Sequence, residues 1–111
     1  MRLPASSGPE RRRTPRLAFG AVAEVTATTT GKYLVAITTE ISRLGCFVKT
    51  TTPFPAGETV MLRITYDGSV LEATSSSVVY TLPSSGMGIA FGAISPREEA
   101  VLEHWLAQRT N

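Results

Sequence analysis

The sequence predicts a mainly β fold in which six antiparallel strands form a small barrel or sandwich, followed by one C-terminal α-helix. Short runs rich in β-branched and aromatic residues recur between residues 21 and 94, turn residues separate these runs, and helical spacing occurs only near the C-terminus. With 111 residues, the chain is long enough to bury one modest core and too short for two. We therefore expect one domain whose helix covers an open end or an edge of the strands.

Six runs are predicted to be strands. The run at residues 59–66 is the clearest, because apolar side chains fall at every second position from Val60 to Tyr66, the period of a half-buried strand. Asp67 and Gly68 follow it directly, and this dipeptide accepts the positive φ angles of a two-residue hairpin turn, so the next run should fold back antiparallel. The six predicted strands are residues 21–27, 32–39, 46–50, 59–66, 69–80 and 86–94.

A helix is predicted to begin at Pro96. Ser95 and Glu98 have the spacing of a capping box, in which the serine hydroxyl accepts a hydrogen bond from a first-turn amide and the glutamate reaches back. Pro96 stands at the first helical position, where a missing N–H group costs nothing. Apolar side chains then recur at helical spacing and predict a stripe that packs on the strands. The stripe consists of Val101, Leu102, Trp105 and Leu106.

The composition argues against several classes of function. No apolar stretch approaches the roughly 20 residues of a membrane span, and the first residues lack the apolar core of a secretory signal, so we expect a cytoplasmic protein without membrane insertion. One cysteine, Cys46, and one histidine, His104, are too few for an internal disulfide or a structural zinc site. No Ser/His/Asp order or carboxylate pair indicates catalysis, so the sequence predicts neither an enzyme nor a metal site.

Positive charge is concentrated at the start of the chain. Residues 1–16 hold five arginines and one glutamate, a net charge of +4, whereas the remaining residues carry a net charge of −2. A basic segment of this kind is typical of a site that receives an anion, although a solvated basic tail is the commoner occurrence. Because residues 1–9 are rich in Pro, Ser and Gly, we expect a disordered leader there, one domain over residues 10–108 and a short tail at residues 109–111.

A second polar stretch lies between two predicted strands, at residues 38–47. It combines the carboxylate of Glu40, the hydroxyl of Ser42 and the flexible backbone of Gly45. Short polar side chains and exposed amides in such a turn can face a ligand, and Gly45 permits either a positive φ or a close backbone approach. Alone, this triplet describes an ordinary polar connection, and its significance comes from the arginines that precede it.

Together the two stretches resemble the PilZ domain, a bacterial receptor module for the dinucleotide second messenger cyclic di-GMP. The family has an RxxxR motif just before the first strand, which Arg12 to Arg16 supply, and a [D/N]xSxxG motif after the second strand, which Glu40 to Gly45 supply with one departure. The last predicted strand and the helix also look like the end of that domain. The resemblance covers residues 10–108 and implies a six-stranded antiparallel barrel with one C-terminal α-helix.

The resemblance also implies how the ligand is held. Arg12 and Arg16 should bind guanine and phosphate, with Arg11 and Arg13 as additional contacts, while the second motif completes the site from the barrel side. Arginine suits both tasks because its planar guanidinium binds phosphate oxygens bidentately and pairs with, or stacks on, guanine. From the residue before RxxxR we expect a stacked pair of ligands. The expected binding residues are Arg11, Arg12, Arg13, Arg16, Glu40, Ser42 and Gly45.

The expected mechanism is an ordering of the arginine segment. Residues 10–16 are polar, flanked by proline and self-repelling, so the two phosphates of the ligand should fold them against the turn at residues 40–45. An unidentified effector protein would then read the change. We expect no cofactor besides the ligand and no DNA or RNA partner, since an oligonucleotide-binding barrel would carry several aromatic residues on one sheet face and those of this chain are scattered in sequence.

Glu40 leaves two functions open. The family has Asp or Asn at this position, and the extra methylene of Glu either moves the acceptor away from its partner or is absorbed by the loop. An unmatched buried polar group would cost about 1–3 kcal/mol, roughly a ten- to hundredfold loss of affinity. The alternative function is a ligand-independent PilZ-type interaction module, of the kind associated with type IV pilus and motility machinery.

Three further features have ordinary structural explanations. Gly86 to Gly88 resembles half of a nucleotide-binding glycine motif, but it leads into a strand, so we expect a tight strand entry and no phosphate cradle. Cys46 is expected to be a small core residue. Trp105 is expected to join the helix to the barrel core, and His104 beside it to be exposed.

Overall fold

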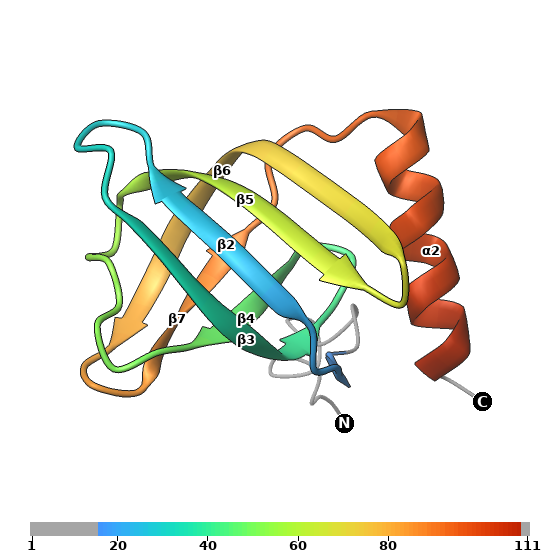
Figure 1. Ribbon diagram of the computed structural model, residues 1–111, viewed down its shortest axis with the longest axis horizontal. Helices are drawn as coiled ribbons and strands as arrows, with labels where there is room; N and C mark the ends of the chain where they lie inside the picture. The colour runs from blue at the N-terminus through green and yellow to red at the C-terminus, as the bar shows by residue number, and fades with distance from the viewer. Residues whose placement is uncertain (1–15, 110–111) are drawn as a thin grey trace, which may run out of the picture.

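The computed structural model describes residues 16–109 of the chain. Within that range it contains β1 Leu17–Ala18, β2 Val22–Ala27, β3 Tyr33–Ile41, β4 Gly45–Lys49, β5 Thr59–Tyr66, β6 Ser69–Leu82, β7 Gly86–Ala90 and α2 Pro96–Arg109 (Figure 1). The predicted leader at residues 1–9 and the last two residues of the predicted tail lie outside the described residues.

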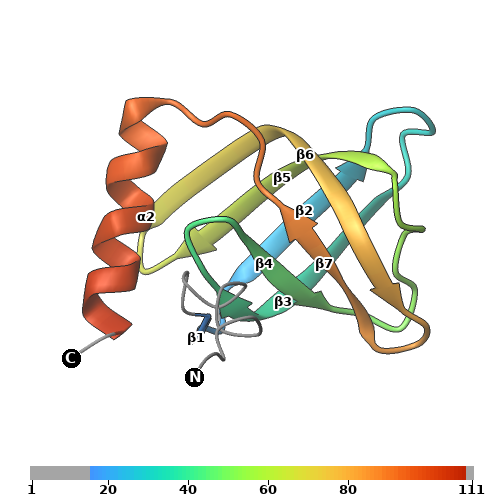
Figure 2. The same ribbon diagram turned by 180° about the vertical axis from the view of Figure 1, so that it is seen from behind.

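Six of the strands close into a barrel. Around the barrel the order is β3, β2, β5, β6, β7 and β4, with β4 pairing back to β3, and every pairing is antiparallel (Figures 1 and 2). The mainly β class, the six-stranded antiparallel barrel and the C-terminal helix are therefore confirmed. Each strand of the ring has a partner on both sides, so closure leaves the ring without a free edge.

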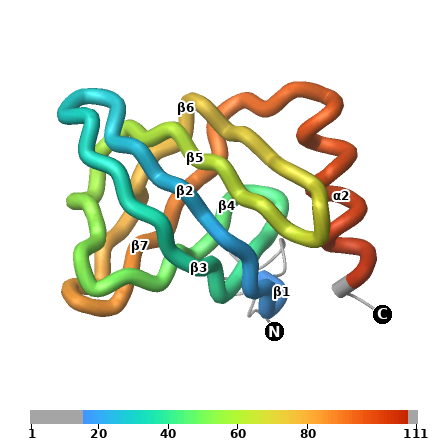
Figure 3. The backbone as a smooth tube through the Cα atoms, viewed as in Figure 1, coloured from blue at the N-terminus to red at the C-terminus, as the bar shows by residue number. Residues whose placement is uncertain are grey.

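β1 is a short strand that the sequence analysis did not predict. It lies outside the ring and pairs with the end of β3, Leu17 with Ile41 and Ala18 with Glu40. The end of β3 therefore has β1 on one side and β4 on the other, whereas its first half pairs with β2. Figure 3 shows the chain passing from β1 into β2 beside the end of β3. Two residues carry too short a hydrophobic pattern to predict a strand.

Three strand ends differ from prediction by two or more residues. β3 continues to Ile41 because its last residues still pair with β1 and β4. β6 continues to Leu82, which pairs with Gly86. β7 ends at Ala90, four residues short of its predicted end, at the residue that pairs with Gly45, the first residue of β4.

The β5–β6 hairpin has the predicted two-residue turn. Asp67 and Gly68 have φ angles of 52° and 80°, the positive values that a type I′ turn requires, and Tyr66 pairs with Ser69 across the turn. The alternation predicted for β5 also holds, since its residues 60, 62 and 64 are buried and those between them are exposed.

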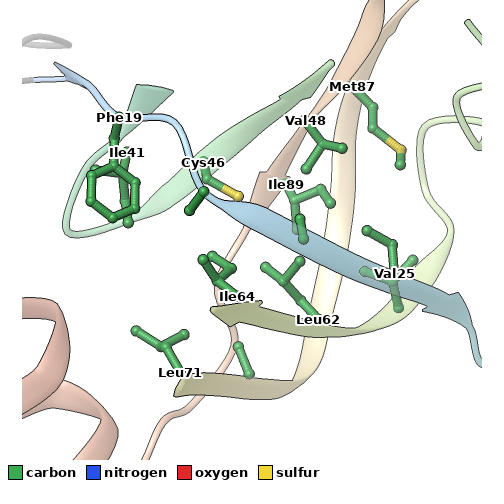
Figure 4. Packing of buried hydrophobic residues seen from close by; sticks show 14 of the residues in the cluster. Phe19, Val25, Ile41, Cys46, Val48, Leu62, Ile64, Leu71, Met87 and Ile89 are labelled. Atoms are coloured by element: carbon green, nitrogen blue, oxygen red, sulfur yellow. The ribbon is translucent and has the colours of Figure 1, made fainter. Parts of the chain in front are cut away.

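Apolar side chains from every strand of the ring fill the barrel interior, and Figure 4 shows many of them converging on one another. α2 closes one end of this core, beside the β5–β6 hairpin (Figures 1 and 2). Trp105 is only 1% exposed, and its ring centroid lies 5.2 Å from that of Phe19 and 6.0 Å from that of Tyr66. The prediction that Trp105 joins the helix to the core is confirmed, and His104 beside it is exposed.

The start of α2 follows the predicted capping box. Pro96 is the first helical residue, and the Ser95 hydroxyl accepts a hydrogen bond from the Glu98 amide at 3.2 Å. The same hydroxyl donates to the Glu98 carboxylate. Both partners of the box are thus in place, and the helix begins where the sequence predicts.

Candidate functional site

The β3–β4 turn is shorter than the sequence suggested. It comprises only residues 42–44, because Glu40 lies within β3 and Gly45 begins β4. The Ser42 amide donates to the Gly45 carbonyl at 2.9 Å, and the Ser42 hydroxyl accepts from the Leu44 amide at 3.1 Å. Ser42 is buried, so its side chain holds the turn in shape rather than facing solvent.

Gly45 is required by a close backbone approach. A Cβ atom at this position would lie 2.0 Å from the carbonyl oxygen of Ile89 in β7, far inside van der Waals contact. Of the two explanations that the sequence left open, the structure selects close approach and not a positive φ. The missing side chain allows β4 and β7 to pair directly beside the turn.

β1 brings Arg16 to the end of β3. Arg16 directly precedes β1, in which Ala18 pairs with Glu40. Arg16 and Ala18 lie on the same side of the strand, so the Arg16 side chain reaches Glu40, and its Nε atom is 3.7 Å from Glu40 Oε1. The two side chains are 54% and 45% exposed. An ion pair this open to solvent is worth little in stability and is easily exchanged for another partner.

A groove of about 720 Å³ opens on the barrel wall at this point. It is lined by all four of the predicted binding residues that the structure describes: Arg16, Glu40, Ser42 and Gly45. Arg11, Arg12 and Arg13 lie outside the described residues. A second hollow of about 460 Å³, between the β2–β3 turn and the segment before β5, contains none of the predicted residues.

The groove also contains residues that sequence reasoning missed. They come from the β3–β4 turn and from the outer face of β4, β6 and β7: Leu44, Phe47, Val79, Tyr80 and Gly88. Alternation with buried Cys46 and Val48 would have placed Phe47 on the outer face of its strand. No local signal, however, says which residue of a distant strand lies next to it, because that depends on register.

The turn is tied to the C-terminal helix by an ion pair. The Arg43 guanidinium contacts the carboxylate of Glu103 in α2. Arg43 occupies one of the variable positions between Ser42 and Gly45, so the second motif contacts the helix as well as the groove.

Cys46 lies in the core directly after the turn, as predicted. Burial raises the pKa of its thiol to about 12 from an ordinary value of 9.0. The thiol is therefore protonated at neutral pH and is a poor nucleophile. Among residues 16–109, no group of three or more His, Cys, Asp or Glu side chains is arranged to hold a metal ion, and no helix in that range is long and apolar enough to cross a membrane.

A family model for the PilZ domain matches residues 10–108, which is nearly the whole chain. The chain belongs to the PilZ family. PilZ domains form a receptor family for cyclic di-GMP, and they are ligand-binding modules rather than enzymes. A comparison with curated proteins gives no significant match.

Solved PilZ structures share the fold at low sequence identity. The PilZ domain of CeSA from a cellulose-synthesizing bacterium is 16% identical with a TM-score of 0.68, and the match covers 86% of this chain and 98% of that one. The PilZ domain with c-di-GMP of YcgR from Escherichia coli is 15% identical with a TM-score of 0.70, covering 90% and 92%.

Another relative is larger than this chain. The Bacillus subtilis inhibitor of motility MotI/DgrA is 16% identical with a TM-score of 0.75, and the match covers 90% of this chain but 51% of that protein. This chain thus spans about half the length of that relative, and the likeness concerns the barrel and its helix.

The close approach at Gly45 predicts that Gly45→Ala destabilises the fold. The added methyl group collides with the backbone of β7, so we expect a loss of at least about 1–3 kcal/mol in the free energy of unfolding, measured by urea denaturation. Gly20→Ala is the matched control, because a Cβ atom there meets nothing within 4 Å. Equal stability of the two variants would contradict the close approach of β7 at Gly45.

The raised pKa of Cys46 predicts slow labelling by iodoacetamide at pH 8 in the folded chain and rapid labelling in urea. The thiol ionises near pH 9 in the unfolded chain and near pH 12 in the folded one, so the unfolded state loses its proton first. This group should therefore lower the free energy of unfolding as the pH rises from 9 towards 12, and Cys46→Ala should remove its contribution. Rapid labelling without urea would show that the thiol is accessible after all.

Proposed function

We propose that the chain binds cyclic di-GMP in the groove beside the β3–β4 turn. The observation that carries the proposal is that Arg16 and three residues of the second motif, which are separate stretches of the sequence, line one groove. Membership in a cyclic di-GMP receptor family supports the choice of ligand. The fold shared with the YcgR domain, described with c-di-GMP, agrees with it.

The chemistry of the groove residues fits this ligand. Cyclic di-GMP has two phosphodiester anions and two guanines, and the half-exposed Arg16 guanidinium is free to turn from Glu40 to a phosphate or a guanine edge. The Glu40 carboxylate can accept hydrogen bonds from the N–H groups of guanine. Ser42 and Gly45 act as positioning residues, the first by fixing the turn and the second by letting β7 approach it.

The proposal extends to the residues that precede Arg16. Arg12 would hold the ligand together with Arg16, and Arg11 and Arg13 would add further cations to the same groove. We propose that the arginine segment orders when it meets the phosphates, that a stacked pair of ligands is bound, and that an effector protein in the cytoplasm reads the change. These statements rest on the family motif and on the basic charge of residues 10–16.

One observation favours the second candidate function, a ligand-independent interaction module. Glu40 has the length to reach Arg16, and the 3.7 Å ion pair already engages the guanidinium that the ligand would need. In that case the pair would be a surface feature of a protein-binding face. A titration with ligand separates the two functions.

Isothermal titration with cyclic di-GMP up to about 1 mM, enough to detect about −4 kcal/mol of binding, should give a saturable curve whose stoichiometry reports one ligand or a stacked pair. Arg16→Ala should lower the affinity about ten- to hundredfold, because it removes a charge-assisted hydrogen-bonding group. Arg63→Ala is a close control, since Arg63 has similar exposure and lies 3.7 Å from Glu72 but outside the groove. It should change the affinity less than about twofold.

A flat titration of the unaltered chain would favour the interaction module. Equal losses in the Arg16 and Arg63 variants would instead indicate general charge attraction without a defined site.

Glu40→Asp should raise the affinity for cyclic di-GMP. The shorter side chain no longer reaches the Arg16 Nε atom, so the ligand would not have to displace a competing carboxylate. Because an exposed ion pair is worth about 0.2–1 kcal/mol, the gain should be at most about fivefold in the same titration. Glu40→Gln keeps the side-chain length but removes the charge, so it tests whether the carboxylate of Glu40 competes with the ligand for Arg16. A loss of affinity in Glu40→Asp would show that the longer acceptor binds the ligand better.

A further inference from the structure

One row of residues crosses four strands at the floor of the groove. Glu40 in β3 pairs with Phe47 in β4, Phe47 pairs with Gly88 in β7, and Gly88 pairs with Tyr80 in β6. Figure 2 shows β4, β7 and β6 side by side in this order. Residues paired across strands lie on the same face of a sheet, and this row is on the outer face, because its neighbour row is buried in the core.

Two glycines of β7, Gly88 in this row and Gly86, make room for the two aromatic rings. A Cβ atom on Gly88 would lie 2.3–2.8 Å from three atoms of the Tyr80 ring, and one on Gly86 would lie 2.6 Å from two atoms of the Phe47 ring. The rings therefore lie over β7, with centroids 6.1 Å apart and planes inclined by 28°. The Gly-Met-Gly stretch, which resembles a nucleotide-binding motif in sequence, here seats an aromatic pair.

This aromatic pair is not part of the barrel core. Tyr80 is 41% exposed and lines the groove with Phe47, whereas the ring cluster around buried Trp105 packs under the helix. The aromatic residues that are scattered in sequence are thus partly gathered on one outer face. An exposed aromatic ring that lies over a glycine at the floor of a groove suits a ligand with a flat apolar face.

We propose that Phe47 and Tyr80 form a stacking platform for a purine base of the ligand, with Tyr80 as the contact that selects for the base. This rests on the proposed function and deepens it. Measured along the curved wall of the barrel, Phe47 is one strand spacing from Glu40 and Tyr80 is three, roughly 14 Å. Both rings line the same groove as Arg16, so a dinucleotide held by Arg16 and the motif turn can follow the wall and place a base on the platform. Purine faces stack on aromatic side chains in this manner.

The test is a titration of four variants with cyclic di-GMP. Tyr80→Ala should lower the affinity at least about fivefold, the lower end for a lost base stack, while Tyr80→Phe, which keeps the ring, should stay within about twofold of the unaltered chain. Gly88→Ala should also lower the affinity, because its methyl group displaces the Tyr80 ring without removing it. Tyr33→Ala is the matched control, since Tyr33 is 58% exposed on the outer face of β3 but does not line the groove.

A second readout separates stacking from a structural effect. In the unaltered chain, the Tyr80 ring protons should shift upfield in the NMR spectrum when ligand is added, and those of Tyr33 should not move. If the unaltered chain binds but Tyr80→Ala and Tyr33→Ala have equal affinities, the platform is overturned and the proposed function stands. If the unaltered chain does not bind at about 1 mM ligand, the proposed function and the platform are both overturned.

Discussion

The β3–β4 ladder is the interaction on which the rest of the molecule depends. Without it, β3 and β4 would be the two open edges of a six-stranded sheet, and the ladder turns that sheet into a barrel. The same ladder ends at residues 42–44, where β1 joins β3 from the other side and Gly45 admits β7. The groove therefore lies at the seam of the barrel, and its walls come from segments that meet only when the barrel closes.

Local signals in the sequence predicted the elements that are stabilised locally. The alternation from Val60 to Tyr66 followed by Asp67 and Gly68 specified the β5–β6 hairpin, and Ser95 with Pro96 specified the start of α2. β1 could not be predicted, because two residues have no periodicity and their strand exists only through pairing with the distant end of β3. Strand ends were misplaced where they depend on the length of a partner, as at Ala90.

The motifs predicted which residues lie together at the groove but not how each is used. Arg16 and Glu40 carry exposed charges. The Ser42 hydroxyl instead accepts a hydrogen bond within its own turn, and Gly45, which has no side chain, lets β7 approach closely. The neighbouring Phe47 and Tyr80 are distant in sequence, and their meeting depends on two ladders and on an irregularity between Val78 and Tyr80. Register of this kind is decided by the packed core and not by any short stretch.

The Arg43–Glu103 ion pair gives the seam a second attachment, and its strength is set by the solvent. Both side chains are about half exposed, so mobile ions compete for them and the attraction weakens as the ionic strength rises. At low ionic strength this ion pair links the C-terminal helix to the β3–β4 turn. In concentrated salt the same two elements are held to the barrel only by their separate packing, so ionic strength changes how tightly the C-terminal helix is coupled to the groove while leaving the hydrophobic core intact.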